Sequence, residues 1–248
     1  MRPADPRRAP RAARPATALV ASLLLAACAP RPFRIVPTGP IAPVRAAALA
    51  ASPPAEAGDF LPTDLVELVA LDPTIRLDIR YAGTRNFLGT AIYSSPRAFL
   101  QRPAAEAVVR VHRALAAQGY GLLIHDAYRP WYVTKVFWEA TPDSLHRFVA
   151  DPARGSRHNR GCAVDLTLFD RRTGRAVTMP SGYDEFTPRA FADAPAGTAA
   201  QRARRAVLRA AMEREGFTVM PDEWWHFDCR DWRRYRIGNI PVESLPPR

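Results

Sequence analysis

Prolines are concentrated in the N-terminal quarter of this 248-residue chain, where 12 of the 25 lie within the first 62 residues. Proline has no amide hydrogen and fixes its own φ angle, so such a stretch rarely supplies the strands and helices of a core. The rest of the chain is long enough for one full-sized core. The composition of the whole chain, with 48% hydrophobic and 24% charged residues, excludes a disordered protein. We therefore expect a single folded domain over residues 59–248.

The first 27 residues have the layout of a secretory signal peptide. A basic stretch ends at Arg14, an apolar run covers residues 16–27, and Cys28 follows. The run is shorter than the ~20 residues that span a bilayer. Its end, Leu25-Ala-Ala-Cys28, resembles the bacterial lipobox, which implies export to the periplasm, lipidation of Cys28 and anchoring to a membrane, with the outer membrane favoured by Ala29. An ordinary signal peptide followed by a chance cysteine is the alternative.

Residues 28–58 are rich in alanine and proline and show no sustained apolar period. We expect them to form an extended tether between the membrane and the domain.

The formal net charge of +11 raises the question of a nucleic-acid partner. Part of the excess lies in the signal peptide, and Lys135 is the only lysine, so a general arginine and alanine bias explains the charge more simply. The chain has no lysine-rich run, zinc-finger spacing or aromatic RNA-binding motif. We therefore expect no nucleic-acid partner.

Helical and strand patterns alternate without a regular βαβ rhythm, which favours an α+β fold over a doubly wound sheet. Capping and breaking residues predict one helix from Pro103 to before Gly119 and a second from Thr198 to Glu215, ended by Gly216. Apolar and alternating runs predict strands over residues 65–71, 75–81, 121–125, 162–169 and 217–220.

Two of the five histidines stand in sequences that suit a metal site. His158 lies in a block that continues to Asp165, and His226 ends the run Glu223-Trp-Trp-His226. A catalytic zinc site needs three protein ligands and one open position, which His158, Asp165 and His226 supply. Glu223 has the place of a general base. Taken singly, each of these histidines fits a structural or exposed role better than a metal-binding one, and the tryptophan pair fits core packing.

Several sequence blocks occur in a fixed order between about residues 65 and 231. They are Tyr81, Asn86-Phe87, Tyr93, the block 119–130 ending in Tyr-Arg-Pro, Ser156-x-His158-x-x-Gly-x-Ala-x-Asp165, Gly182-Tyr-Asp184 and Glu223-Trp-Trp-His226. Together these blocks resemble the D-alanyl-D-alanine dipeptidases of the zinc D,D-peptidase family.

The resemblance implies a single α+β domain with a small central antiparallel sheet and flanking helices. It also implies one Zn²⁺ on His158, Asp165 and His226, with Glu223 as the base and Arg129 steadying the oxyanion. Substrate binding falls to Asp184 for the ammonium, Ser156 and Tyr93 for the carboxylate end, and Tyr81. The implied reaction is hydrolysis of a small D,D-dipeptide to free D-amino acids in cell-wall peptide turnover.

Two features depart from the family. Arg157 stands where a small polar residue is usual, which leaves the dipeptide preference open, and the export signal is absent from the best-known members. Cys162 and Cys229 each lie within four residues of a proposed zinc histidine, so they form either a disulfide or two free thiols close together. A D,D-carboxypeptidase or murein peptidase acting on longer stems, and a non-catalytic peptidoglycan-binding lipoprotein, are the alternative functions.

Overall fold

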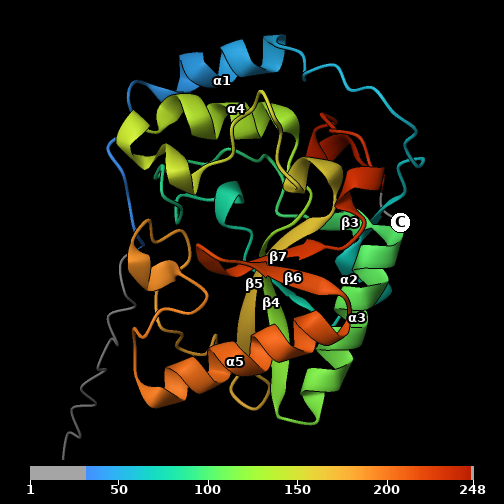
Figure 1. The fold of residues 1–248 in the computed structure, drawn as a ribbon, viewed down its shortest axis with the longest axis vertical. Coiled ribbons are helices and arrows are strands. Elements are labelled where there is room, and N and C mark those ends of the chain that lie inside the picture. Colours follow the sequence, from blue (N-terminus) through green and yellow to red (C-terminus); the bar gives the residue numbers. More distant parts are fainter. Residues whose placement is uncertain (1–31, 247–248) are drawn as a thin grey trace, which may run out of the picture. The chain divides into compact units, whose positions relative to one another are not determined.

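A five-stranded sheet forms the centre of the protein in the computed structural model, which describes residues 32–246 (Figure 1). The strand order is β2 (Arg76–Leu77), β4 (Tyr120–Asp126), β5 (Ala163–Asp170), β7 (Glu223–Cys229) and β6 (Phe217–Met220). Strand β2 runs parallel to β4, and the other neighbours are antiparallel. The α+β class and the mainly antiparallel sheet predicted from the sequence are confirmed.

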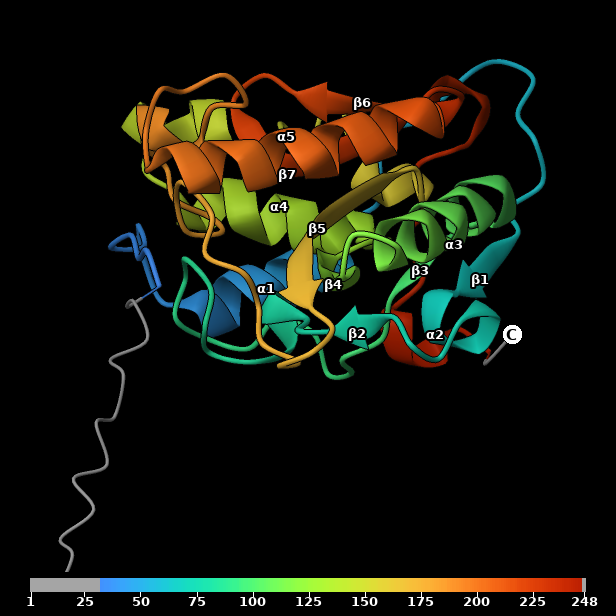
Figure 2. The ribbon, with the colours of Figure 1, turned by 90° about the horizontal axis from the view of Figure 1, so that it is seen from below.

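Helices α3 (Arg102–Ala116) and α5 (Ala199–Arg214) lie on one side of the sheet and face the viewer in Figure 2. Helix α3 begins with Pro103 in its first turn, where no amide hydrogen is needed. Helix α5 begins with a capping box in which Thr198 and Gln201 exchange hydrogen bonds. These local signals explain why both helices begin close to the predicted residues.

Helix α4 (Trp131–Ala140) lies on the opposite side of the sheet from α5 (Figure 1). Seven of its ten residues are buried, including Trp131, Val133 and Phe137, and only Lys135, Trp138 and Glu139 are partly exposed. A helix with so narrow a polar face shows little amphipathic pattern, so the sequence pattern did not predict it.

The two strands predicted near the start of the domain are shorter than expected. Strand β1 (Leu65–Glu67) pairs with β3 (Phe99–Gln101), and the chain then forms the short helix α2 (Leu68–Leu71). The second run supplies only β2 before a 3₁₀ turn at Arg80–Ala82. The Asp72 carboxylate accepts hydrogen bonds from the amide and hydroxyl of Thr74, which stabilises a turn between the two segments.

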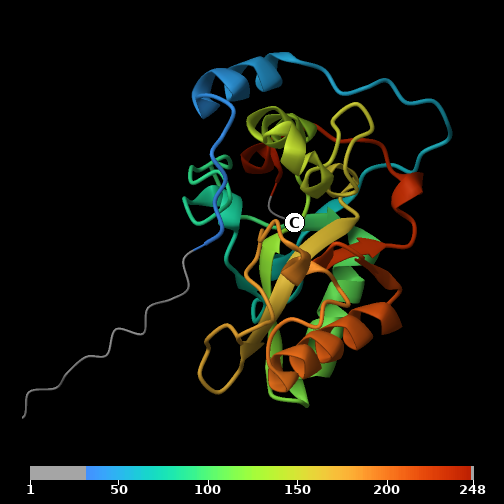
Figure 3. The same ribbon diagram turned by 60° about the vertical axis from the view of Figure 1, so that its left-hand side comes forward.

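The segment expected to be an extended tether is folded onto the domain over its described part, so that prediction is wrong there. Helix α1 (Ile41–Ala50) packs on α4 (Figure 3). Phe33 and Ile35 contact the main hydrophobic core. Further along, Glu56 pairs with Arg160 and accepts the amide of Ile237. Within the described residues, packing against the domain therefore already includes residues 33–50, which precede the predicted boundary at residue 59.

The predicted signal peptide and the predicted lipidation site at Cys28 lie outside the described residues. Within residues 32–246, no helix combines the length and apolar character needed to cross a bilayer.

Candidate active site

Two carboxylate side chains and one imidazole lie in one row across the central sheet. Asp126 on β4 is paired with Asp165 on β5, and Asp165 is paired with His226 on β7. Directly paired residues on neighbouring strands project from the same face. The strand register therefore gathers these groups on one face.

His158 reaches the row from the 3₁₀ turn His158–Arg160 that leads into β5. The turn ends at Gly161, whose φ of 65° lies in the left-handed region. A Cβ at this position would also lie 2.5 Å from Leu65 Cδ2. The turn therefore requires glycine for both its backbone angle and its close packing.

The donor atoms of His158, Asp165 and His226 form a small triangle. His158 Nε2 lies 3.1 Å from His226 Nδ1 and 3.3 Å from Asp165 Oδ1, and His226 Nδ1 lies 3.0 Å from Asp165 Oδ1. Ligands bonded to one tetrahedral ion at ~2.0 Å lie about 3.3 Å apart, so the triangle has the dimensions of a metal site. Asp165 Oδ1 is buried and has no hydrogen-bond partner among the described residues, as expected for a ligand atom.

A second set of contacts orients each donor. His158 Nδ1 lies 2.7 Å from the Ala127 carbonyl, which can only accept, so Nε2 keeps its lone pair for the site. His226 Nε2 donates to Asp228 Oδ1 at 2.9 Å, which leaves the Nδ1 lone pair free. The Tyr183 hydroxyl donates to Asp165 Oδ2 at 2.8 Å. Such outer contacts fix ring orientation and tautomer in metal sites.

Glu223 lies beside this triangle, with Oε2 3.7 Å from His226 Nδ1. Burial raises the pKa of Glu223 to about 7, with Asp165 adding to the rise and His226 opposing it. A carboxyl with a pKa near neutrality can both accept and return a proton under ordinary conditions.

Arg129 is held against the other end of the row. Its Nε donates to Asp126 Oδ2 at 2.8 Å, and its Nη2 lies 3.7 Å from Asp165 Oδ2. The guanidinium carbon also lies 4.8 Å from the ring centre of Phe137 on α4. These contacts hold a buried positive charge at the edge of the candidate metal site.

Tyr93 was expected to contact the substrate carboxylate, but the structure places it elsewhere. It does not line the cavity, and its hydroxyl donates to Asp126 Oδ1 at 2.8 Å. Because Asp126 also accepts a hydrogen bond from Arg129, Tyr93 acts on the arginine indirectly, through the carboxylate that positions it. The sequence could not show that Tyr93 is outside the cavity lining, because its partner Asp126 lies 33 residues away in the chain.

A cavity of about 310 Å³ opens in front of the metal triangle. Among the predicted site residues it is lined by Tyr81, Arg129, Ser156, His158, Asp165, Asp184, Glu223 and His226. Asp184 stands at its wall in the left-handed region, with a φ of 56°. Asp184 Oδ1 accepts a hydrogen bond from Tyr81, whereas its buried Oδ2 has no partner among the described residues.

Burial raises the pKa of Asp184 well above its usual range, and the charges of Asp165 and Glu223 add to the rise. A buried carboxyl in this setting is stabilised as a carboxylate when a cation reaches it.

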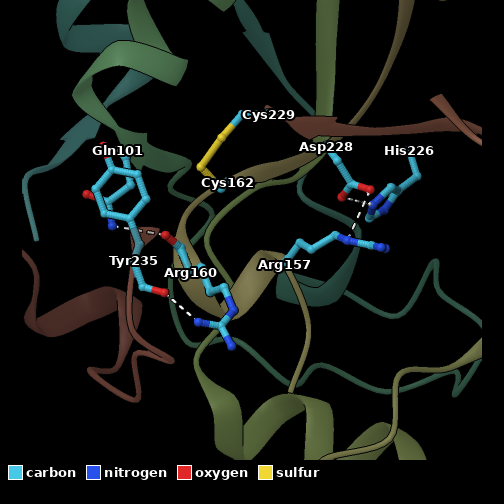
Figure 4. The surroundings of a disulfide bond; sticks show 8 residues. All are labelled: Gln101, Arg157, Arg160, Cys162, His226, Asp228, Cys229 and Tyr235. Carbon is cyan, nitrogen blue, oxygen red and sulfur yellow. Dashed lines mark hydrogen bonds and ion pairs between the residues drawn. A yellow bond between two sulfur atoms is a disulfide. The ribbon is translucent and has the colours of Figure 1, made fainter. Parts of the chain in front are cut away.

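Cys162 and Cys229, the pair identified from the sequence, are joined by a disulfide beside the site (Figure 4). It links the residue before β5 to the last residue of β7, and Cys229 N also donates to the Cys162 carbonyl at 2.8 Å. The strands that carry Asp165 and His226 are therefore covalently connected.

The sequence reasoning missed three residues that position the site: Asp126, Tyr183 and Asp228. Asp228 could have been inferred, since it lies two residues after His226 on the same strand and therefore on the same face. Asp126 and Tyr183 lie inside recognised blocks. Asp126 lies only three residues before its partner Arg129, whereas Tyr183 and its partner Asp165 are 18 residues apart and gave no local signal.

Comparisons with known proteins agree with this geometry. Residues 62–237 match the M15 peptidase family described as D-ala-D-ala dipeptidase. A D-alanyl-D-alanine dipeptidase of Escherichia coli (strain K12) is 37% identical over 175 residues, which cover 71% of this chain and 89% of that protein. Proteins of the same name from Enterococcus faecium and Streptomyces coelicolor are 34% and 32% identical, covering 63% and 70% of this chain and 87% and 93% of theirs. The chain therefore belongs to the D-ala-D-ala dipeptidase family of peptidases.

Proposed function

We propose that this protein is a zinc-dependent dipeptidase that hydrolyses D-alanyl-D-alanine, or a closely similar D,D-dipeptide, to free D-amino acids. The observation that carries the proposal is that a candidate metal site and a buried carboxylate line one cavity. The donor atoms of His158, Asp165 and His226 form a metal-sized triangle, and Asp184, whose Oδ2 has no hydrogen-bond partner among the described residues, lines the same cavity.

The donor set of two imidazoles and one carboxylate suits zinc. Zinc held by His158, Asp165 and His226 would polarise the scissile carbonyl and lower the pKa of water to ~7. Glu223 would accept the proton of the attacking water and return it to the leaving amine. Arg129, held by Asp126, would stabilise the negative charge that develops on the carbonyl oxygen.

Asp184 favours a dipeptide over a longer stem peptide as substrate. A free dipeptide carries an ammonium group next to the scissile bond, and this group would supply the missing partner of Asp184 Oδ2. In a longer stem the same nitrogen is acylated and uncharged, so the buried carboxylate would stay unpaired, which is unfavourable. Asp184 would therefore select for the free amino terminus.

The test is D-alanine release by the full-length protein from D-Ala-D-Ala and from N-acetyl-D-Ala-D-Ala, with and without a zinc chelator. We expect chelator-sensitive release from the free dipeptide and at least 100-fold slower release from the acetylated one, the upper part of the range for an unpaired buried charged group. Equal release from both would indicate a D,D-carboxypeptidase. No release from either, in protein shown to contain zinc, would favour a non-catalytic binding protein.

A Glu223→Gln variant separates the base from the metal site. It retains a similar volume and hydrogen-bonding capacity but cannot accept a proton. We expect normal zinc content with turnover reduced at least 100-fold. Unchanged turnover would remove Glu223 from the proposed role.

We also propose that the chain is exported and anchored through a lipid on Cys28, where it would act on peptides released during cell-wall turnover. The sequence 25–28 supports this proposal. Labelling of cells with radioactive palmitate should mark the wild-type protein in the membrane fraction and leave a Cys28→Ser variant unlabelled. Labelling of both proteins, or of neither, would contradict it.

A further inference from the structure

The cavity is lined by both acidic and basic side chains. Asp184 and Glu223 supply acidic groups, whereas the segment 147–157 contributes Arg147, Arg154 and Arg157 to the lining. The proposed function assigns the substrate ammonium to Asp184 but assigns no cationic partner to the carboxylate of the dipeptide. Tyr93, which was expected at that end of the substrate, does not line the cavity.

Of the three arginines, Arg157 lies next to the metal triangle. Its Nε is 3.3 Å from Asp228 Oδ2, and the other oxygen of Asp228 accepts the hydrogen of His226 Nε2 (Figure 4). Its guanidinium carbon lies 5.0 Å from the ring centre of Trp232. Arg157 is therefore held on one edge by an ion pair with a carboxylate, without a hydrogen bond from Nε, and on one face by an indole ring.

The remaining edge of Arg157 is available to a ligand. Its side chain is 40% exposed, and no hydrogen bond from its Nη atoms to any residue in the described part of the chain is present. A guanidinium has five donors in a planar fork, so the Nε edge can hold Asp228 while the two Nη atoms hold a second carboxylate.

Arg147 and Arg154 are less suited to this role. Arg147 is paired with Asp222 at 3.1 Å. Arg154 is exposed and makes no ion pair with a described residue, so nothing in the structure fixes its side chain. A mobile arginine loses more conformational entropy when it binds a ligand.

Ser156 adds a second donor beside Arg157. Its Oγ accepts the amide hydrogen of His158 at 3.2 Å, and its hydroxyl hydrogen has no acceptor among residues 32–246. Ser156 is buried and lines the same cavity. A carboxylate held by Arg157 could accept this hydrogen as well.

We propose that Arg157 binds the C-terminal carboxylate of the substrate through its Nη atoms, with Ser156 as a second donor, and so restricts the enzyme to peptides with a free C-terminus. This inference rests on the proposed dipeptidase function and extends it to the other end of the substrate. Asp184 and Arg157 would then select the zwitterionic dipeptide from its two ends.

Arg157 could instead act only as a positioning residue, since it touches Asp228 and Asp228 holds His226. The two roles differ in what they predict for a substrate without a C-terminal charge. A carboxylate ligand is irrelevant to a C-terminal amide, whereas a disturbed metal site would impair the amide and the free acid alike.

The test compares D-Ala-D-Ala with D-Ala-D-Ala amide in the wild type and in Arg157→Gln, Arg157→Lys and Arg233→Gln. Arg233 is the matched control, because it also lies over Trp232, at 4.2 Å, but does not line the cavity. For Arg157→Gln we expect about a 10- to 100-fold loss of kcat/KM on the free acid, mainly through KM, and less than about a threefold change on the amide. Arg157→Lys should recover part of the loss, and Arg233→Gln should match the wild type.

A binding experiment keeps this proposal separate from the proposed reaction. In a zinc-loaded Glu223→Gln background, calorimetric titration should show tighter binding of D-Ala-D-Ala than of its amide, and Arg157→Gln should abolish that difference. If the wild type fails to hydrolyse the dipeptide but this binding preference is present and lost in Arg157→Gln, the proposed function fails and the carboxylate site stands.

Three results would overturn the inference: equal losses on the acid and the amide, loss of zinc in Arg157→Gln, or an unchanged preference for the free acid in that variant. The first two would assign Arg157 to positioning through Asp228, and the third would place the carboxylate elsewhere.

Discussion

Removal of the Cys162–Cys229 disulfide should reduce stability strongly while leaving the active site in place. The bond closes a loop of 67 residues in the unfolded chain. With the chain-entropy relation for that loop length, the bond destabilises the unfolded state by about 4 kcal/mol at 25 °C. For a protein of this size the loss corresponds to a decrease in Tm of roughly 8–16 °C.

The folded state should tolerate the change because other contacts hold the same strands together. Ala163 pairs with Asp228 next to the bond, and Cys229 N donates to the Cys162 carbonyl. Cys162 is fully buried, so alanine is the better replacement, since serine would bury a hydroxyl without a partner.

The assay is urea unfolding followed by tryptophan fluorescence, since Trp224 and Trp225 are buried on β7. Cys162→Ala/Cys229→Ala is compared with its parent, both carrying Cys28→Ser so that no third thiol can exchange. Reductant should lower the stability of the parent to that of the double variant and leave the double variant unchanged. A difference below about 1 kcal/mol between oxidised parent and variant would refute the loop-entropy reasoning, and loss of zinc from the variant would refute the independence of the site.

Three further predictions follow from the contacts around the metal triangle. Asp228→Asn should weaken zinc binding about 10- to 100-fold, because the amide orients His226 less strongly than the carboxylate does; competition with a fluorescent chelator measures this, and an unchanged affinity would contradict the role of Asp228. Tyr93→Phe removes one hydrogen bond behind Arg129, so kcat should fall about 3- to 10-fold with KM nearly unchanged, and a change confined to KM in steady-state kinetics would instead place Tyr93 at the substrate. In metal-free protein the Glu223 carboxyl should titrate with a pKa of about 7 by carbon NMR, above its usual 4.5, because burial disfavours the charged form; the folded state then binds more protons than the unfolded state between these values, so this group makes folding less favourable as pH rises through them. A measured pKa below 5 would show that Glu223 is better solvated than the structure indicates.

Local sequence signals predicted the elements whose causes are local. Pro103 and the Thr198 cap mark the starts of α3 and α5, and the apolar run at 162–169 marks β5. The signals failed for α4, which is mostly buried, and for α1, whose proline-rich surroundings suggested a tether. Pro43 lies in the first turn of α1, where an amide hydrogen is not required, so composition alone could not exclude that helix.

The sequence by itself determined which chemical groups the protein has available: two histidines, an aspartate and a glutamate at metalloprotease-like spacing, and blocks sufficient to indicate the family. Only the tertiary structure decided how these groups are arranged. The strand register aligns Asp126, Asp165 and His226, and contacts across the fold turn Tyr93 toward Asp126 and Arg157 toward Asp228. Helix caps and apolar periods act between neighbours in the chain, whereas register and hydrogen bonds between distant residues depend on how the whole core packs, and no local pattern records that packing.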